Sequence, residues 1–399
     1  MLISFVILSL LQYVRLSAQL ERTVCIEYIS MGGTYFSFFI MSNTSKTFFY
    51  DLTQDVTYLS TISSDNVLYN ETLIICPLNN DKCGISYKSL TDLTINYNDN
   101  KTLNIKSFPM FKLPNYEHII SNTVGLSYKH RNIKNNFITN IQEFISSNNF
   151  IISKLNTTLH KGIIAFGGFD NVIKQPFYNS SCKVNQLYNY WGCDLHKIIL
   201  TNNDTTNDIS YNISYYSMFQ INQTQIAVPT EFMNEVIKPL YLEKYIKEGL
   251  CKQYGTSIFE RYLCKCEIVE KLPKIHFVFN DEGKENGIEV EAKYLFENYG
   301  KECRFLIEGW MYEGFKHIIF GSCLFNHLDV LFNYNESKIT FFSDVPFNRY
   351  FKYNVNENNN EIELSIKITK VILNILLLYT VFLFIFIKYT KLLIRDNNK

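Results

Sequence analysis

Short apolar runs, rich in aromatic and β-branched residues, alternate along the chain with turns of Asn, Gly, Ser and Thr. In residues 36–50, the run FSFFIM enters the polar turn Ser42-Asn43-Thr44-Ser45, and a second aromatic run leaves it. A related arrangement recurs where residues 215–219 enter the turn of residues 220–224. Runs of this kind predict β-strands. We therefore expect an all-β ectodomain of two similar lobes, each presenting one turn to a shared centre.

The first residues have the pattern of a targeting segment. Residues 2–11 form an apolar run, and Leu16-Ser17-Ala18 supplies small residues for cleavage. This pattern is typical of a secretory signal peptide over residues 1–18, although a retained anchor and a buried first strand are alternatives.

The last residues have the pattern of a membrane span. Residues 371–387 are uncharged and apolar apart from Asn374 and a few hydroxyl or phenol groups. Four basic residues follow them, so the positive-inside rule places residues 388–399 in the cytosol. We expect a single-pass type I membrane protein whose ectodomain is lumenal or extracellular; a buried core helix is the alternative for the apolar segment.

Composition sets the size and the class of partner. With 399 residues, of which 47% are hydrophobic, the chain can build two domains with apolar cores. Its formal net charge is zero, which gives no reason to expect a nucleic-acid partner. The expected order is a signal peptide (1–18), an N-terminal β lobe (19–200), a C-terminal β lobe (201–350), a juxtamembrane linker (351–370), a transmembrane helix (371–387) and a cytosolic tail (388–399).

Ten cysteines in a secreted chain are expected to form disulfides. Spacing alone suggests two local pairs, Cys76–Cys83 and Cys182–Cys193. A zinc site near Cys251, Cys264 and Cys266 is the competing interpretation, but no His cluster accompanies them. We therefore expect no metal and no cofactor, and spacing assigns no partner to Cys25, Cys251, Cys264 or Cys323.

Sequons for N-glycosylation are numerous, which in a secreted chain predicts a glycoprotein. We expect several of them to carry sugar, chiefly those at Asn70, Asn156, Asn179, Asn203, Asn212 and Asn335.

Four motifs of the first half of the chain occur in a recognisable order. They are YISMGGT (28–34) before the strand at Phe36, LTINYND (93–99), VGLSY (124–128), and GIIAFGGFD (162–170) followed by Tyr190-Trp191. In this order they resemble the opening strands, the flap, the segment behind the first catalytic loop and the Gly-Gly-x-Asp turn of pepsin-like aspartic peptidases. The resemblance implies a bilobal fold and puts Tyr97 in the place of the flap tyrosine, over the cleft.

The second half continues the resemblance up to about residue 345. Pro229 and a helical stretch at 231–237 resemble the segment after the second catalytic motif, and residues 318–325 with 338–341 resemble the terminal strand-loop-strand. Between them lies a block similar to the disulfide-spanned block of the family. The resemblance thereby implies a disulfide between Cys266 and Cys303.

The catalytic motifs themselves depart from the family. Its members hydrolyse peptides with two aspartates that share a proton. Aligned by the flanking strands, the first aspartate position holds Met41 and the second holds Gln220, and the motif glycines correspond to Asn43 and Asn222. Because neither a thioether nor an amide acts as a general base near neutral pH, no residue in these two positions would activate the water.

Other residues are weak substitutes for the missing pair. Asp51, Asp55 and Asp99 lie nearby in sequence, but none follows an apolar strand and precedes Thr-Gly or Ser-Gly. The histidines are scattered, and none sits beside a nucleophile motif.

We therefore expect a catalytically inactive aspartic-peptidase-like membrane glycoprotein that binds a peptide or protein through its ectodomain, for example by strand addition in the groove. An adhesive or structural role is equally open. The alternative from another class is an active membrane-anchored aspartic-type endopeptidase whose catalytic loops do not align with Met41 and Gln220.

Overall fold

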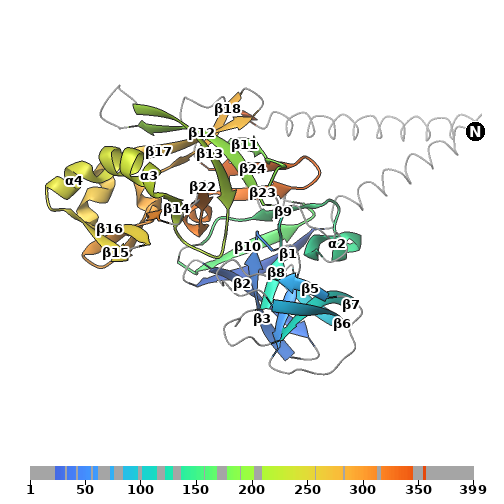
Figure 1. The fold of residues 1–399 in the computed structure, drawn as a ribbon. Coiled ribbons are helices and arrows are strands. Elements are labelled where there is room, and N and C mark those ends of the chain that lie inside the picture. Colours follow the sequence, from blue (N-terminus) through green and yellow to red (C-terminus); the bar gives the residue numbers. More distant parts are fainter. Residues whose placement is uncertain are drawn as a thin grey trace, which may run out of the picture. The chain divides into compact units, whose positions relative to one another are not determined.

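The computed structural model is built mainly of β-strands (Figure 1). It describes residues 23–31, 34–41, 44–54, 57–61, 72–75, 84–97, 101–114, 122–128, 136–156, 158–168, 178–188, 190–201, 209–256, 258–281, 284–311, 316–344 and 354–355.

The chain divides into two compact units, Met1–Tyr353 and Asn354–Lys399. Within the second unit, the structure describes the short strand β25 (Asn354–Val355). Among the described residues, no helix is long and apolar enough to cross a membrane. The predicted signal peptide, linker and tail, and the predicted span at 371–387, lie outside the described residues, apart from the two residues of β25.

The first half of the large unit contains a series of strands and two short helical turns. They are β1 (Val24–Met31), β2 (Thr34–Met41), β3 (Thr44–Asp51), β4 (Tyr58–Thr61), β5 (Thr72–Ile75), β6 (Gly84–Tyr97), β7 (Lys101–Pro114), β8 (Asn122–Gly125), α2 (Phe137–Asn140), η2 (Gln142–Phe144), β9 (Asn149–Ile152), β10 (Lys161–Phe166) and β11 (Tyr178–Lys183).

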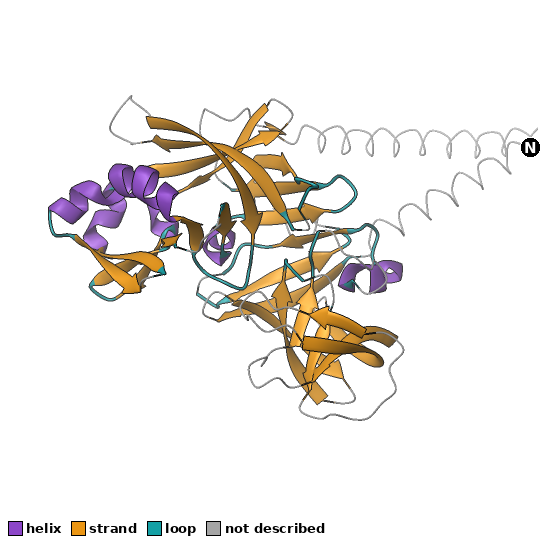
Figure 2. Cartoon of the chain, viewed as in Figure 1, coloured by secondary structure: helices purple, strands orange, loops and turns teal. Residues whose placement is uncertain are grey.

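The second half carries the remaining strands and most of the helical residues (Figure 2). They are β12 (Gly192–Thr201), β13 (Ile209–Phe219), β14 (Ile226–Pro229), α3 (Thr230–Phe232), η3 (Met233–Leu242), α4 (Glu243–Lys247), β15 (Cys251–Thr256), β16 (Phe259–Lys265), η4 (Cys266–Lys271), β17 (Lys274–Asp281), β18 (Lys284–Val290), η5 (Ala292–Tyr294), β19 (Phe296–Tyr299), β20 (Glu302–Phe305), β21 (Ile307–Trp310), β22 (His317–Phe320), η6 (Ser322–Asn326), β23 (Asp329–Asn333) and β24 (Lys338–Ser343).

Two large sheets organise these strands. One has the order β11-β24-β23-β9-β10-β1-β2-β3-β8-β4-β7-β6-β5. The other has the order β18-β17-β12-β13-β22-β14-β21-β16-β20-β19, with β15 paired to β16. Strands β23 and β24, from the end of the unit, join the first sheet by pairing β23 with β9. The two lobes therefore share a sheet rather than being joined by one linker.

Side chains alternate along the strands as a half-buried sheet requires. In β1, Val24, Ile26 and Tyr28 are buried, whereas Cys25 and Glu27 between them are not. Tyr28 stacks on Tyr35 of β2 with ring centroids 4.4 Å apart. Burying a large apolar side chain contributes roughly 1.5–3 kcal/mol, so the buried residues of β1 and β2 help to stabilise the first sheet.

The helical stretch predicted at residues 231–237 is present, within a continuous run from α3 through η3 to α4. Pro239 lies inside this run. Because proline has no N–H and its ring crowds the preceding turn, it favours the widened turns that the run adopts there. Met233 and Ile237 face the core.

Candidate functional site

The first turn of interest follows β3, which ends at Asp51. β3 runs parallel to β8, and Asp51 lies opposite Gly125 in that ladder. The carbonyl oxygen of Asp51 accepts a hydrogen bond from Leu126 N at 2.8 Å, and that of Gln54 accepts one from Ser127 N at 3.0 Å. Backbone contacts with a single segment therefore fix both ends of the turn.

The second turn follows β13 and is built on the same plan. β13 runs parallel to β22, with Phe219 opposite Phe320. Gln220 comes next, and its N–H donates to the carbonyl oxygen of Phe320 at 2.9 Å. Gly321, the residue after Phe320, is therefore opposite Gln220, as Gly125 is opposite Asp51 in the first lobe. Gln220 and Asp51 therefore hold equivalent positions in the two lobes.

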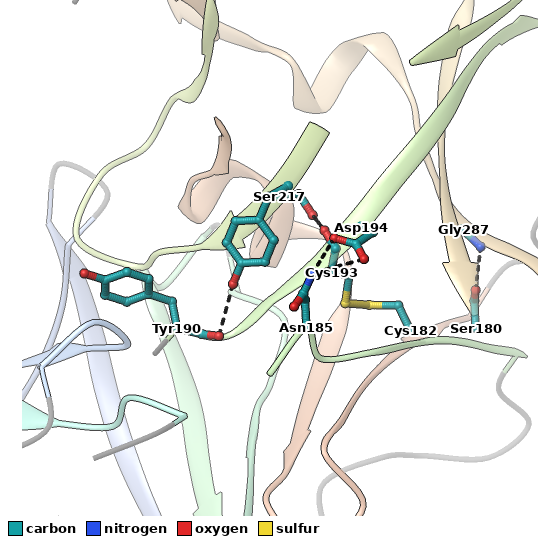
Figure 3. Close-up of a disulfide and its surroundings, with 9 residues drawn as sticks. Ser180, Cys182, Asn185, Tyr190, Cys193, Asp194, Ser217 and Gly287 are labelled. Atoms are coloured by element: carbon teal, nitrogen blue, oxygen red, sulfur yellow. Dashed lines mark hydrogen bonds between the residues drawn. A yellow bond between two sulfur atoms is a disulfide. The ribbon is translucent and has the colours of Figure 1, made fainter. Parts of the chain in front are cut away.

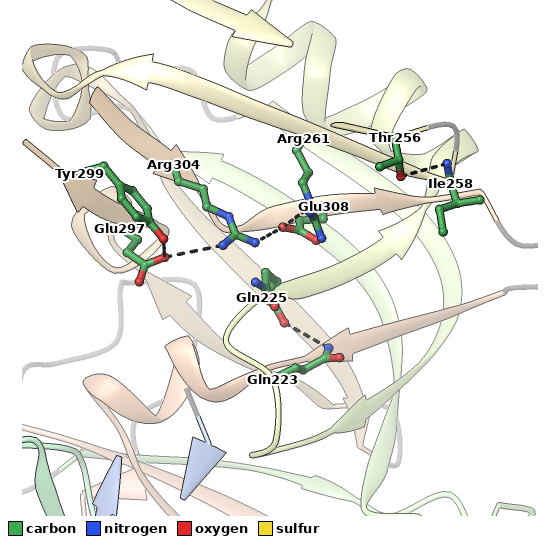
Figure 4. Close-up of polar contacts among 9 residues, drawn as sticks. All are labelled: Gln223, Gln225, Thr256, Ile258, Arg261, Glu297, Tyr299, Arg304 and Glu308. Atoms are coloured by element: carbon green, nitrogen blue, oxygen red, sulfur yellow. Dashed lines mark hydrogen bonds and ion pairs between the residues drawn. The ribbon is translucent and has the colours of Figure 1, made fainter. Parts of the chain in front are cut away.

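Gly321 lets the second turn pack directly on backbone. A Cβ atom at this position would lie 2.1 Å from the carbonyl oxygen of Gln225 and 2.7 Å from that of Gln223. Ser322 N donates to that same oxygen of Gln223 at 2.7 Å, and the Gln223 side-chain amide donates to Gln225 O at 3.3 Å (Figure 4). A residue larger than glycine would force the turn away from β22.

The side chain of Asp51 is buried, with 8% of its surface exposed. Its Oδ1 accepts hydrogen bonds from Thr53 N at 2.8 Å and from Thr53 Oγ1 at 2.5 Å. Burial raises the pKa of this carboxyl above its ordinary value, and the hydrogen bonds from Thr53 and Gln54 offset only part of that effect. Asp51 thus has the environment of an acid that holds its proton more strongly than usual.

Residues of the second turn face Asp51 across the lobes. Asn222 Nδ2 lies 3.5 Å from Asp51 Oδ2. Asn222 Oδ1 and Gln220 Nε2 are buried and have no hydrogen-bond partner among the described residues. A buried polar atom without a partner costs about 1–3 kcal/mol, so both amides have unused capacity to bind water or a ligand.

The structure corrects the assignment of the first aspartate position. Met41 precedes Asp51 by ten residues and lies at the other end of the β2–β3 hairpin, opposite Thr44 and Leu93. The equivalent of Gln220 is Asp51, so the prediction that both carboxylate positions are lost is wrong for the first lobe. The sequence carries one signal for Asp51, namely that it ends the apolar run Phe48-Phe49-Tyr50, but neither Thr-Gly nor Ser-Gly follows it.

Tyr97 ends β6, the strand that pairs with the end of β2. Thr94 of β6 pairs with Ile40 of β2, and from there β6 continues to Tyr97 in the direction of Ser37. The place of Tyr97 over the cleft stays a prediction. Asn43 is outside the described residues, and its neighbours belong to the β2–β3 hairpin end.

An apolar cluster lies beside Gln220. Its buried members are Tyr216, Met218, Ala227 and Ile319, and Tyr188, Tyr190 and Trp310 pack against it while partly exposed. Tyr188 stacks on Tyr216 with ring centroids 3.9 Å apart. Met218 precedes Gln220 by two residues, whereas Trp310 lies opposite Pro229, at the end of β14 remote from the second turn. The aromatic surface formed by Tyr188, Tyr190 and Trp310 therefore extends along these strands away from the turn.

A buried tryptophan and a disulfide support both turns. Trp191 Nε1 donates to Leu126 O at 2.7 Å, which ties β12 to the segment behind Asp51. The adjacent disulfide, Cys182–Cys193, anchors β11 to β12, and the Tyr216 hydroxyl donates to Tyr190 O at 3.2 Å (Figure 3).

Three disulfides are present among the described residues. Cys182–Cys193 is the pair that spacing suggests, and Cys266–Cys303 is the pair that the resemblance implies. Cys251–Cys264, to which the sequence assigned no pairing, links neighbouring strands β15 and β16. Cys76 and Cys83 are outside the described residues. Cys323 is a buried free thiol whose pKa burial raises to about 12, so it is not a nucleophile at neutral pH.

The predicted glycosylation sites fall in different environments. Asn156, Asn212 and Asn335 are exposed, and Asn179 is half-buried. Asn70 and Asn203 lie outside the described residues.

One buried cluster has the composition of a hydrolytic triad. Thr201 Oγ1 lies 2.9 Å from His276 Nε2, and Glu289 Oε2 lies 3.6 Å from His276 Nδ1. These residues join β12, β17 and β18. His276 has no exposed surface and Thr201 only 7%, so a substrate has no access to them and the cluster is structural.

The central site therefore offers one carboxylate and two amides. A general acid–base pair needs two groups that exchange a proton. Asp51 can hold or release one, whereas the Gln220 amide in the equivalent position can do neither near neutral pH. What the arrangement can do directly is hydrogen-bond a polar group placed between the turns.

Comparisons with known proteins agree with this geometry. The family model described as eukaryotic aspartyl protease matches residues 42–343. Four hundred chains of solved structures match the fold. Among them is basic 7S globulin from soybean, with a TM-score of 0.58 and 9% identity, covering 80% of this chain and 94% of that one. A search of curated proteins found no match. From the span of the family match and the pair of equivalent turns, we conclude that this chain belongs to the eukaryotic aspartyl protease family and has its bilobal, mostly β fold.

Proposed function

We propose that the protein is a catalytically inactive aspartyl protease relative, anchored in a membrane, that binds a peptide or protein segment without cutting it. The observation that carries the proposal is Gln220, an amide in the position equivalent to Asp51. Two carboxylates sharing one proton are the basis of the family's hydrolysis. With a single carboxylate, the site lacks the partner that would accept or return the proton during attack by water.

Binding is supported by what surrounds the two turns. The aromatic surface of Tyr188, Tyr190 and Trp310 is partly exposed over the apolar cluster that contains Met218, two residues before Gln220. Aromatic side chains provide large contact areas at a low cost in conformational entropy. Asn222 Oδ1 and Gln220 Nε2 are buried without a hydrogen-bond partner among the described residues, and a backbone amide of a bound peptide would satisfy them where the two turns part.

Anchoring is supported by the sequence at the two ends. The apolar segment at 371–387 with the basic residues after it, together with the signal-like residues 1–18, fits a type I protein with its ectodomain outside the cytosol. Three disulfides fit an oxidising compartment.

The experiment is an activity assay on the full-length chain in lipid nanodiscs. Reduced, carboxymethylated protein substrates are incubated with it from about pH 3 to pH 7, the range over which family dyads titrate. We expect no cleavage by the wild type. Gln220→Asp should also be inactive, because Asn222 stands where the family has a glycine and cannot adopt the same range of backbone conformations.

The alternative is a weakly active endopeptidase, and the retention of Asp51 favours it. Its signature would be cleavage that a statine-type inhibitor blocks and that Asp51→Asn abolishes. That result would overturn the proposal.

Binding is measured separately, by the fluorescence anisotropy of a labelled statine-type peptide. Trp310→Ala should weaken binding about tenfold or more, equivalent to about 1.4 kcal/mol, because it removes part of the aromatic surface. Tyr299→Ala is the matched control, since Tyr299 is 58% exposed and outside that cluster. Equal affinity in both variants would refute binding at this surface.

A further inference from the structure

A cavity of about 920 Å³ lies in the first lobe, apart from the two turns. It opens between the end of the β2–β3 hairpin and the strands β6 and β7, with Leu59 of β4 also in its wall. Its volume is within the range of roughly 300–1,000 Å³ for small-molecule sites. The cavity begins at Met41, at the opposite end of β3 from Asp51, so it is not part of the central site.

The cavity lining is mixed, since Thr44, Ser89, Thr91, Thr94 and Asn104 contribute polar side chains, but its most buried part, the floor, is apolar. Met41, Leu59, Leu93 and Ile105 line it, and each of these side chains is at most 7% exposed. An apolar group seated on this floor would gain roughly 25 cal/mol for each Å² removed from water.

The rim is basic. Lys46 and Lys112 are half-buried and Lys106 is exposed, and all three line the cavity. Within the described part of the chain, none of the three forms an ion pair with a carboxylate. The acidic residue of the lining, Asp92, already accepts a hydrogen bond from Ser107 N at 3.0 Å. The rim therefore presents an excess of unpaired ammonium groups over an apolar floor.

The backbone of the floor is not open to an added strand. Met41 pairs with Thr44 on one side and with Leu93 on the other, and Leu93 pairs in turn with Ile105. An extended peptide could not add to these paired strands, which favours a small molecule over a peptide segment as the occupant.

We propose that this cavity binds an amphiphilic anion, with an apolar body on the floor and a phosphate or carboxylate head among Lys46, Lys106 and Lys112. Ammonium groups bind such heads by charge-assisted hydrogen bonds. Tight binding needs both the apolar body, which contacts the floor, and the anionic head, which contacts the lysines of the rim.

The test measures binding of hexyl phosphate to the full-length chain in phosphatidylcholine nanodiscs by titration calorimetry, with empty nanodiscs as the blank. Hexanoate, hexanol and inorganic phosphate are titrated in the same way. We expect one saturable site for hexyl phosphate and for hexanoate. Hexanol and inorganic phosphate should each bind at least tenfold more weakly, since each lacks one half of the ligand.

Two variants locate the site. The triple variant Lys46→Gln, Lys106→Gln, Lys112→Gln should weaken binding of hexyl phosphate tenfold or more. Its control is Lys265→Gln, Lys271→Gln, Lys301→Gln, which removes the same charge from exposed positions of the second half. Thr91→Trp, which places a large side chain in the cavity wall, should block binding without changing net charge.

The outcomes are decisive in either direction. Loss of binding in the first triple variant and in Thr91→Trp, with the control unchanged, supports the proposal. Equal losses in the two triple variants would mean non-specific charge attraction. If hexanol bound as tightly as hexyl phosphate, the lysines would not contribute to binding. If inorganic phosphate bound as tightly as hexyl phosphate, the apolar floor would not contribute. Each of these results overturns the proposal. The statine-peptide assay of the central site is independent of all of them.

Discussion

Asn222 Nδ2 lies 3.5 Å from Asp51 Oδ2 and joins the two central turns across the lobes. In an active member of the family, the proton at this centre is shared by two carboxylates. Here the group that faces Asp51 is an amide, which offers its N–H and takes no proton. The contact therefore favours a fixed, hydrogen-bonded centre over a titrating pair.

The first prediction concerns the pH dependence of stability. Burial raises the pKa of Asp51 above its ordinary value of 3.8, so the fold favours the neutral acid. The stability that the neutral Asp51 carboxyl contributes is fully present below pH 3.8, and it is lost as the pH rises through the raised pKa of the folded state. Asp51→Asn cannot ionise. The free energy of unfolding of the variant, relative to wild type, should therefore increase between pH 3.5 and pH 7, by about 1.4 kcal/mol for each unit of the shift.

Urea unfolding at several pH values measures this difference. Glu336→Gln, at an exposed position, is the control and should leave the pH dependence unchanged. A flat or falling difference for Asp51→Asn would show that Asp51 is stabilised as the anion, contrary to the environment described.

A second prediction tests the close packing of the second turn. Gly321→Ala would place a methyl group 2.1 Å from the carbonyl oxygen of Gln225. Because backbone atoms must move to accommodate it, we expect a loss of about 2–4 kcal/mol in stability. Gly300→Ala is the matched control. Gly300 has a positive φ of 83° but no neighbouring atom within 4 Å of the added Cβ, so only about 1 kcal/mol of backbone strain is expected. Thermal unfolding of the two variants compares them, and equal losses would contradict the steric argument.

The third prediction concerns a buried acid of the second lobe. Glu308 has 2% of its side chain exposed and lies 2.9 Å from Arg261 Nε and 2.5 Å from Arg304 Nη2 (Figure 4). Glu308→Gln keeps the shape but removes the anion that both guanidinium groups contact, so that Arg261 loses this carboxylate and, of the described carboxylates, Arg304 keeps only Glu297, 3.9 Å away. We expect the free energy of unfolding to fall by about 2–4 kcal/mol. The loss should be smaller than for a fully buried ion pair, because the Arg261 side chain is 28% exposed. Glu302→Gln breaks the exposed pair with Lys252 instead and should cost less than about 1 kcal/mol. Similar losses measured by urea unfolding would refute the distinction.

The sequence predicted the fold better than it predicted the site. Strand alternation and the order of motifs are properties of the whole chain, so the β architecture and the place of Gln220 followed from them. The register of the β2–β3 hairpin could not be read in the same way, because Met41 and Asp51 both end apolar aromatic strands. Only the parallel pairing of β3 with β8 separates them, by placing Asp51 opposite Gly125. That pairing joins residues some seventy positions apart, which no local pattern encodes.

The last prediction uses the sequon at Asn222 to test whether the central turns are closed. A glycan would be attached to Nδ2, the atom that faces Asp51, while Oδ1 of the same side chain is buried. A glycan is bulky and must remain in water, so modification would require the turns to separate. We expect Asn222 to be unmodified in protein from a secretory host, whereas the exposed Asn156, Asn212 and Asn335 should carry sugar.

Glycopeptide mass spectrometry measures the occupancy of each site, with Asn335 as the internal control. High occupancy at Asn222 would mean that the enzymes of glycosylation reach the second turn and that a sugar holds it away from Asp51. A peptide could not then lie between the turns, and an adhesive or structural role of the ectodomain would replace the binding function proposed above.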